Sequence, residues 1–181
     1  MNSIVLTGGT SKRFGSDKSQ AKIHGKTLLE YLSDGLENLI IVGPETSISA
    51  KYVREEPIGA GPVAAIAAAM KVVDSDLVVI YATDMPFAPR ITNQLVSALK
   101  NDAAIAIDCD GKLQPLAGIY RSDKLRGALA TYESVENQSV KSLIVKLVVD
   151  EVPVVETEYL MDIDTQEDLL KAVDLASRLA P

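Results

Sequence analysis

A glycine-rich, basic loop follows the first apolar run of the chain. Ser3–Thr7 (SIVLT) predicts a buried strand, and the segment LTGGTSKRFGSDK leads directly out of it. Glycines tolerate positive φ and close backbone approach, so successive N–H groups can point at an anion. Arg13 can neutralise phosphate oxygens as a planar fork and Lys18 as a point charge. The residue types therefore predict a phosphate site, with a solvated basic loop as the alternative.

Two familiar phosphate loops do not fit this segment. A GxxxxGK[ST] loop needs Lys after its last glycine, and here Gly15 is followed by serine. The dinucleotide fingerprint GxGxxG is not supplied by Gly8-Gly9-Thr10. The stretch before the first predicted helix is nevertheless long, and long ordered loops are usually functional.

A carboxylate stands just past another strand. Leu77–Ala82 (LVVIYA) predicts a central strand covered on both faces, and Pro86 prevents it from continuing beyond Asp84. Ligands of open parallel sheets bind outside the carboxyl ends of the strands, so Asp84 and the glycine loop should face one crevice. A carboxylate there suits Mg²⁺, which takes carboxylates together with substrate phosphates. The alternative is an Asp that caps the next turn.

Two further acidic segments are candidates for the same site. In MDIDTQEDL, Asp164 and Glu167 have the spacing of a capping box at the start of the last helix, which leaves Asp162 as a candidate second metal ligand. In REEPIGAGPVAAI, glycines precede a helix N-terminus, a favourable place for an electronegative group. Glu55 or Glu56 can accept hydrogen bonds from the N1 and N2 donors of guanine, and a solvated turn is the alternative.

The elements that must position these residues alternate between strands and helices, which predicts an α/β fold with a mostly parallel sheet. No repeat or linker interrupts the chain, so residues 1–181 are expected to form one domain. The predicted strands are Ser3–Thr7, Leu39–Val42, Tyr52–Arg54, Leu77–Ala82, Ala103–Ile107, Pro115–Tyr120 and Val152–Val155. The predicted helices are Lys26–Leu36, Pro62–Val73, Ile91–Lys100, Ser122–Tyr132, Ser139–Leu147 and Thr165–Leu179.

Composition excludes several classes of protein. The chain has 181 residues, 47% of them hydrophobic, and a net charge of -7 without any basic run, which argues against a nucleic-acid or anionic-membrane partner. Its one cysteine, Cys109, excludes an intrachain disulfide. The start lacks the basic and apolar regions of a secretory signal, so we expect a cytoplasmic protein.

Six segments, in order along nearly the whole chain, resemble the molybdenum cofactor guanylyltransferases (MobA-type) of the nucleotidyltransferase superfamily. LTGGTSKRFGSDK is similar to the family opening LAGGxSxRxGxDK, and IHGKTLLEYL to its GxPLLE-like continuation. GAGPVAAI resembles GPLAGI, TDMPF resembles CDMPF, QPLAGIYR resembles HPLxGLY, and DIDTQEDL resembles NINTPEDL. The chain departs from the family where Gly43 replaces a frequent Asn and Gln114 a frequent His.

The resemblance implies a Rossmann-like three-layer sandwich with a mostly parallel central sheet, GTP as donor, Mg²⁺ as cofactor and a molybdopterin-type acceptor. Carried over by position, it implies phosphate binding by Lys18, a guanine-side acidic residue at Glu56, or at Glu55, and Mg²⁺ binding by Asp84, with Asp162 as the candidate second ligand. The nucleotide would contact Leu6, Thr7, Gly8, Gly9, Lys18, Glu56 and Asp84. Implied partners are a molybdoenzyme or another cofactor-biosynthesis protein, with the chain a monomer or weak oligomer.

The mechanism we expect is direct displacement at the α-phosphorus, with Arg13 and Lys18 as catalytic groups that neutralise charge. Neither Cys109 nor His24 stands in the setting of a nucleophile. Three alternatives stay open: a cytidylyltransferase for molybdopterin, a guanylyltransferase for cobinamide phosphate, and a non-catalytic nucleotide-binding regulator.

Overall fold

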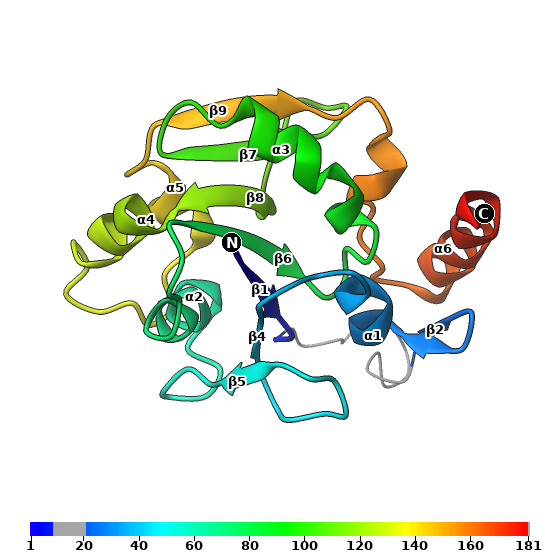
Figure 1. The fold of residues 1–181 in the computed structure, drawn as a ribbon, viewed down its shortest axis with the longest axis horizontal. Helices are drawn as coiled ribbons and strands as arrows, with labels where there is room; N and C mark the ends of the chain where they lie inside the picture. Colours follow the sequence, from blue (N-terminus) through cyan, green and yellow to red (C-terminus); the bar gives the residue numbers. More distant parts are fainter. Residues whose placement is uncertain (9–20, 181) are drawn as a thin grey trace.

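A seven-stranded sheet forms the centre of the protein, whose computed structural model describes residues 1–8 and 21–180. Within these residues the strand order is β5-β4-β1-β6-β8-β7-β9 (Figure 1). Only β8 runs antiparallel to its neighbours β6 and β7, and the other pairs are parallel. The strands are β1 (Asn2–Leu6), β4 (Leu39–Val42), β5 (Lys51–Val53), β6 (Leu77–Ala82), β7 (Ala103–Ile107), β8 (Leu113–Arg121) and β9 (Val149–Pro153). The predicted mostly parallel sheet is confirmed.

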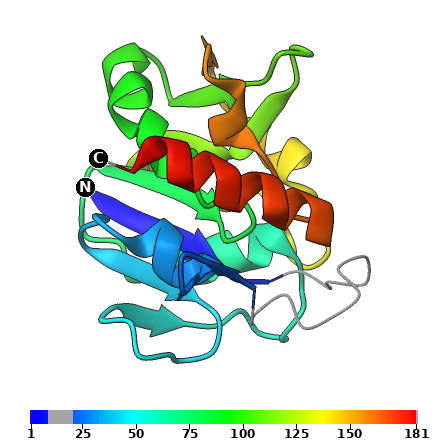
Figure 2. The ribbon, with the colours of Figure 1, turned by 90° about the vertical axis from the view of Figure 1, so that its right-hand side faces the viewer.

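Helices cover both faces of this sheet, as Figures 1 and 2 show. On one face, α2 (Pro62–Met70), α4 (Ser122–Leu129) and α5 (Val140–Ile144) pack against alternate residues of the strands. On the other face lie α1 (Leu28–Ser33) and α3 (Thr92–Ala98), with Leu32 and Leu95 fully buried. Because β1 is buried on both faces, its five residues are apolar or internally bonded rather than alternating with exposed ones. The expected three-layer sandwich is confirmed.

A small hairpin precedes α1 where a helix was predicted from Lys26. It consists of β2 (Lys22–Ile23) and β3 (Lys26–Thr27), joined through His24 and Gly25 at positive φ. The helix starts only after Thr27, whose hydroxyl accepts from the Glu30 N–H at 3.2 Å while the Glu30 carboxylate accepts from the Thr27 N–H at 2.7 Å. This capping box satisfies both orphan N–H groups and places the start of α1 at Leu28.

The last helix, α6 (Gln166–Leu179), lies along one side of the molecule (Figure 2). Its apolar side packs Ala172 and Leu175 against Ile23 of the hairpin and Phe87. The capping-box prediction for Asp164 and Glu167 is wrong by one residue. The box instead joins Thr165 and Asp168, because Thr165 adopts the extended conformation of a cap and its hydroxyl accepts from the Asp168 N–H at 3.2 Å. Hydrogen bonding from the Thr165 hydroxyl holds the pKa of Asp168 below its usual range.

Other element boundaries differ from the predictions by a few residues. In place of the predicted helix Ile91–Lys100, α3 covers Thr92–Ala98, and a 3₁₀ turn, η2 (Ala88–Ile91), precedes it. A second 3₁₀ turn, η3 (Thr157–Leu160), was not predicted. The last strand lies at Val149–Pro153 rather than Val152–Val155, since it pairs in parallel with the whole of β7.

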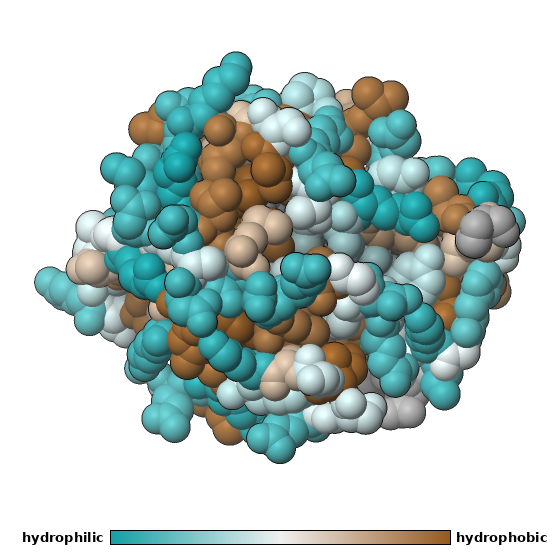
Figure 3. Space-filling model, in the orientation of Figure 1, coloured by the Kyte–Doolittle hydropathy of each residue, from teal (hydrophilic) through white to brown (hydrophobic). Residues whose placement is uncertain are grey.

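The surface of the face seen in Figure 3 carries apolar side chains in separate patches among polar ones. Across residues 1–8 and 21–180, none of the helices combines the length and apolar character that crossing a bilayer requires.

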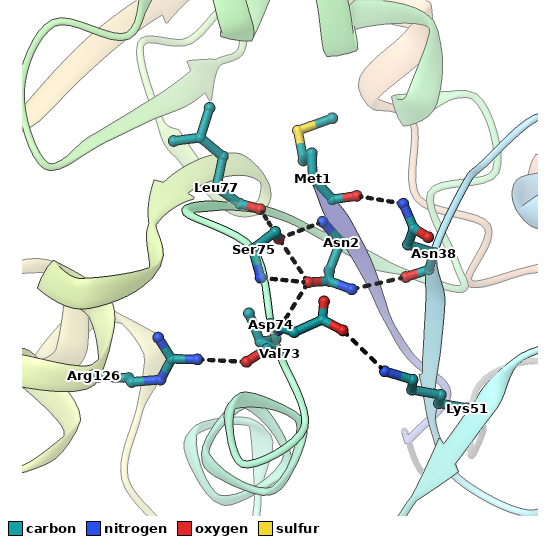
Figure 4. Close-up of polar contacts among 9 residues, drawn as sticks. All are labelled: Met1, Asn2, Asn38, Lys51, Val73, Asp74, Ser75, Leu77 and Arg126. Atoms are coloured by element: carbon teal, nitrogen blue, oxygen red, sulfur yellow. Dashed lines mark hydrogen bonds and ion pairs between the residues drawn. The ribbon is translucent and has the colours of Figure 1, made fainter.

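A buried asparagine joins the amino end of β1 to two connections (Figure 4). Asn2 is 2% exposed, and its Oδ1 accepts from the backbone N–H groups of Asp74 and Ser75, each at 3.2 Å. Its backbone N–H donates to the Ser75 hydroxyl at 2.9 Å, and its Nδ2 donates to the Asn38 carbonyl at 3.5 Å. The start of β1 is thereby joined to the α2–β6 connection and to the turn before β4.

We expect Asn2→Ala to lower the free energy of unfolding by about 2 kcal/mol, because two N–H groups lose their acceptor inside the protein. Urea denaturation followed by circular dichroism measures this change. Asn93→Ala, an exposed asparagine on α3, is the matched control. A change within about 0.5 kcal/mol, the usual scatter of surface substitutions, for Asn2→Ala would show that water replaces the side chain.

Candidate functional site

The carboxyl ends of β4, β1 and β6 meet at one edge of the sheet. Leu6 is in register with Val42 of β4 on one side and with Ala82 of β6 on the other. Thr7 and Gly8, which follow β1, therefore leave the sheet at the same edge as the residues that follow β6 (Figure 1). Gly8 has open space where a side chain would stand, which permits close approach of a ligand to the backbone.

Thr83 connects Asp84 to the start of the loop. Its backbone N–H donates to the Leu6 carbonyl at 3.0 Å, and its hydroxyl donates to the same oxygen at 2.9 Å. The half-buried Asp84 follows directly in the chain. The position of this carboxylate is therefore set relative to β1, and sequence reasoning missed the residue that sets it. The sequence signal that could have indicated this role is a threonine directly after a predicted strand.

The segment that carries Asp162 lies beside Asp84. The backbone N–H of the fully buried Ile163 donates to the Asp84 carbonyl at 2.9 Å. This bond brings two segments that are 79 positions apart in the chain (163 minus 84) to one place at the sheet edge. Asp162 and Asp164, on either side of Ile163, are both exposed. The structure therefore brings the two predicted metal-ligating segments together.

This donor set fits a hard divalent cation. Both candidate ligands are carboxylates, and Mg²⁺ is usually held by one or two of them together with water and substrate phosphates. Within residues 1–8 and 21–180 there is no cluster of three or more His, Cys, Asp or Glu.

The base-side candidates lie in the turn between β5 and α2. Glu55 is half-buried, and its Oε1 accepts from the Gly59 N–H at 3.0 Å, which closes the turn. Glu56 is exposed. The turn leads into Gly61, the N-cap of α2, which has φ 93° and no side-chain cap. The turn that carries the two carboxylates thus leads directly into the N-terminus of α2, which starts at Pro62 as the sequence predicted.

The β7–β8 hairpin extends beyond the sheet at this edge too, because β8 is antiparallel to β6 and its paired stretch begins with Ala117 opposite Tyr81. Asp108 orders the hairpin: its carboxylate accepts from the Lys112 N–H at 2.9 Å and from Nε2 of Gln114 at 2.9 Å. The Lys112 N–H is the main cause that lowers the pKa of Asp108. Gln114 is therefore held by an ionised carboxylate.

The remaining sequence candidates divide into two groups. His24 is on the β2–β3 turn, where its Nε2 is 3.0 Å from the Ser177 hydroxyl of α6, and Cys109 is exposed in the β7–β8 hairpin. Gly9, Arg13 and Lys18 lie outside the described residues, and their proposed roles stay predictions.

A mostly parallel α/β sheet, with a glycine-rich segment after its first strand in the sequence and carboxylates beyond the carboxyl ends of its strands, is the arrangement of nucleotide-binding α/β proteins. Residues 3–152 match the family of MobA-like NTP transferase domains, so the chain belongs to that family.

Relatives in bacteria share part of the sequence. A Geobacillus protein is 32% identical over 135 residues, which cover 66% of this chain and 69% of that protein. A Bacillus subtilis protein is 35% identical over 130 residues, which cover 65% of each chain. Both relatives carry the name probable molybdenum cofactor guanylyltransferase. The match thus spans about two thirds of these two relatives.

Solved structures share the fold over almost the whole chain. The molybdopterin-guanine dinucleotide biosynthesis protein A of Archaeoglobus fulgidus superposes with a TM-score of 0.79 at 23% identity and covers 98% of this chain and 100% of its own. The 2-C-methyl-D-erythritol 4-phosphate cytidylyltransferase of Thermus thermophilus gives a TM-score of 0.66 at 18% identity, with 98% and 100% covered. The first of these proteins is named for a guanine dinucleotide and the second is named a cytidylyltransferase. The fold alone therefore does not determine which base the donor nucleotide carries.

Proposed function

We propose that this chain is a molybdenum cofactor guanylyltransferase, which transfers GMP from GTP to the terminal phosphate of molybdopterin or the molybdenum cofactor and releases pyrophosphate. The observation that carries the proposal is the meeting of the loop exit at Gly8, Asp84 and the Asp162 segment at one sheet edge, in a chain of the MobA-like family. Donor phosphates held by the backbone at Gly8 would then lie on the side of the site that carries Asp84.

In the proposed reaction an oxygen of the acceptor phosphate attacks the α-phosphorus of GTP. The bond from that phosphorus to the bridging oxygen breaks, and the charge leaves on pyrophosphate. Asp84, with Asp162, would hold a divalent cation, which we propose to be Mg²⁺ and which neutralises charge on the donor phosphates when bound. Arg13 and Lys18 would stabilise the same charge, and the backbone at Leu6, Thr7, Gly8 and Gly9 would hold the nucleotide. No covalent enzyme intermediate is required.

For the guanine side, Glu56 is the better candidate. The Glu55 carboxylate already accepts the Gly59 N–H at 3.0 Å, whereas Glu56 is exposed beside it. A free carboxylate can accept from both N1–H and N2–H of guanine, a pair of donors that cytosine does not offer.

We expect Glu56→Gln to raise the KM for GTP about 10-fold with kcat little changed, because one charged acceptor is worth about 1.5–3 kcal/mol. Steady-state kinetics over a range of GTP concentrations measures the split. Glu45→Gln, an exposed glutamate in the β4–β5 connection, is the control. If Glu55→Gln raises the KM more than Glu56→Gln does, the base contact belongs to Glu55.

The experiment that tests the function is pyrophosphate release from GTP, CTP, ATP and UTP in parallel, with Mg²⁺ and molybdopterin. We expect GTP to be preferred and a guanine dinucleotide to form. A preference for CTP would overturn the donor, turnover only with cobinamide phosphate would overturn the acceptor, and Mg²⁺-dependent GTP binding without turnover would indicate a regulator.

Four further proposals accompany this function. Residues 1–181 act as one domain, since a single sheet links the amino-terminal strand to β9. The chain is located in the cytoplasm, where GTP is available. It is a monomer or weak oligomer, a proposal supported on the one face seen in Figure 3 by apolar surface that is divided into patches. The finished cofactor passes to a molybdoenzyme or another cofactor-biosynthesis protein.

A further inference from the structure

Two threonines tie the carboxyl ends of three adjacent strands in the same way. Thr83, after β6, donates both its N–H (3.0 Å) and its hydroxyl (2.9 Å) to the Leu6 carbonyl of β1. Thr7, after β1, donates both its N–H (3.2 Å) and its hydroxyl (2.8 Å) to the Val42 carbonyl of β4. Each carbonyl is the last of its strand, so the hydroxyls add one bond to each ladder where it would otherwise end.

Gly43 makes room for the second of these contacts. A Cβ at Gly43 would stand 1.9 Å from the Thr7 hydroxyl oxygen and 3.2 Å from the Thr7 Cβ. Rotating Thr7 would remove its bond to Val42, and the two Cβ atoms would still be closer than ordinary contact. Position 43 therefore has to be glycine as long as Thr7 keeps this bond. The Gly43 N–H donates to the Val53 carbonyl of β5 at 2.9 Å. The contacts of Thr83, Thr7 and Gly43 therefore form one row across the carboxyl ends of four neighbouring strands.

The row runs from the metal side of the site to its base side. Thr83 is followed by Asp84, Thr7 by Gly8, and Val53 ends the strand before the Glu55–Glu56 turn. A nucleotide bound at this edge would lie along the row, with phosphates toward Asp84 and the base toward Glu56. The spacing between these two ends would then depend on how the three strand ends are held.

We propose that Thr83, Thr7 and Gly43, here named the threonine clasp, position Asp84 and the base-side turn relative to the nucleotide-binding backbone. The inference rests on the proposed function of the site. The clasp residues are positioning residues, because the contacts that define them are made to strand carbonyls. The backbone bonds from both threonines persist when the hydroxyls are removed, so the fold should survive while the alignment loosens. A misplacement of about 1 Å in such a site can cost about 100-fold in rate.

The first test compares Thr83→Val, which has the same shape without the hydroxyl, with Thr83→Ser, which retains it. We expect Thr83→Val to lower kcat about 10-fold and to raise by about 5-fold the Mg²⁺ concentration that half-saturates binding of a fluorescent GTP analogue. Thr83→Ser should stay within about threefold of the wild type on both measures. Thr131→Val is the matched control, since the Thr131 hydroxyl also donates to a backbone carbonyl, that of Ala128 at 2.8 Å, at the C-terminal end of α4.

The second test uses the Thr7–Gly43 contact. We expect Gly43→Ala to raise the KM for GTP about 10-fold and to lower Tm. The double variant Thr7→Ala/Gly43→Ala should recover part of the loss in Tm, because the 1.9 Å contact with the hydroxyl is gone, but should keep the raised KM, because the hydroxyl bond to the Val42 carbonyl is missing. A Gly43→Ala protein with unchanged KM, or a double variant with the wild-type KM, would overturn the role of the Thr7–Gly43 contact.

Outcomes for the clasp and for the proposed function separate cleanly. If the wild type transfers GMP and Thr83→Val matches it, or if Thr83→Ser is as impaired as Thr83→Val, the clasp is overturned and the function stands. If the wild type prefers another nucleotide, the function is overturned and the clasp is tested with that nucleotide. A wild type that binds none of the four nucleotides overturns both. If the activity of Thr83→Val falls only in proportion to its Tm, and Thr131→Val shows the same relation, the clasp has a structural role and does not position the site.

Discussion

Asp84→Asn is expected to lower the rate of GMP transfer about 100- to 1,000-fold, the effect of removing one preorganised charge contact from a transfer site. Asparagine has nearly the same size as aspartate, and the substitution leaves the backbone carbonyl that accepts the Ile163 N–H at 2.9 Å. The sheet edge should therefore stay in place. What is lost is the negative charge that would hold a divalent cation against the donor phosphates. Pyrophosphate release at saturating GTP, repeated over a range of Mg²⁺ concentrations, measures the change.

The control for this substitution is Asp123→Asn. Asp123 is an exposed carboxylate in the first turn of α4, which follows β8 at the opposite edge of the sheet, since Arg121 pairs with Leu77 at the start of β6. Asp162→Asn in the same Mg²⁺ titration tests the second ligand. Turnover of Asp84→Asn at the wild-type rate, with the same Mg²⁺ dependence, would remove Asp84 from the site.

Lys18→Ala is expected to have an effect of similar size, about 100- to 1,000-fold on transfer, because the lost ammonium group no longer neutralises charge on the α-phosphate and the departing pyrophosphate. The expectation rests on the sequence, where Lys18 closes the glycine-rich segment that leaves β1. Single-turnover measurements at saturating GTP separate this loss from weaker binding.

Lys22→Ala is the matched control for Lys18. Lys22 is an exposed lysine four positions further along the chain, on β2. Because both substitutions remove one positive charge from a chain of net charge -7, a general electrostatic effect would appear in both variants. Equal losses for the two variants, or intact turnover of Lys18→Ala, would contradict a specific phosphate role.

Three strands of the sheet were predicted without error, whereas the helices α1 to α5 end two or three residues earlier than predicted. Leu39–Val42, Leu77–Ala82 and Ala103–Ile107 lie where the apolar runs placed them, because strands covered on both faces must be apolar throughout. The hairpin before α1 was missed, since two-residue strands carry no measurable period. Its pairing depends on contact between Ile23 and α6, nearly 150 positions further along the chain.

The site was predicted in part for a similar reason. Asp84 and the glycine-rich segment could be assigned to one edge, because parallel strands in an α/β sheet carry their ligands at their carboxyl ends. Which of Glu55 and Glu56 is free could not be predicted, since it depends on the Gly59 N–H folding back to Glu55. The threonine clasp was also missed, because Thr7 and Thr83 stand within segments that resemble the family motifs LAGG and CDMPF, which contain neither threonine.

The sequence by itself determined the class of this protein: a chain of alternating apolar strands and helices, with a glycine-rich basic segment after the first strand and an aspartate after a buried one. These features are local, so residue types and spacing suffice to predict them. Only the tertiary structure decided that Ile163 bonds to Asp84, that Thr165 rather than Asp164 caps α6, and that Gly43 is needed because Thr7 occupies its side-chain space. Each of these depends on backbone geometry or on atoms brought together by the sheet, and no local pattern encodes such a contact.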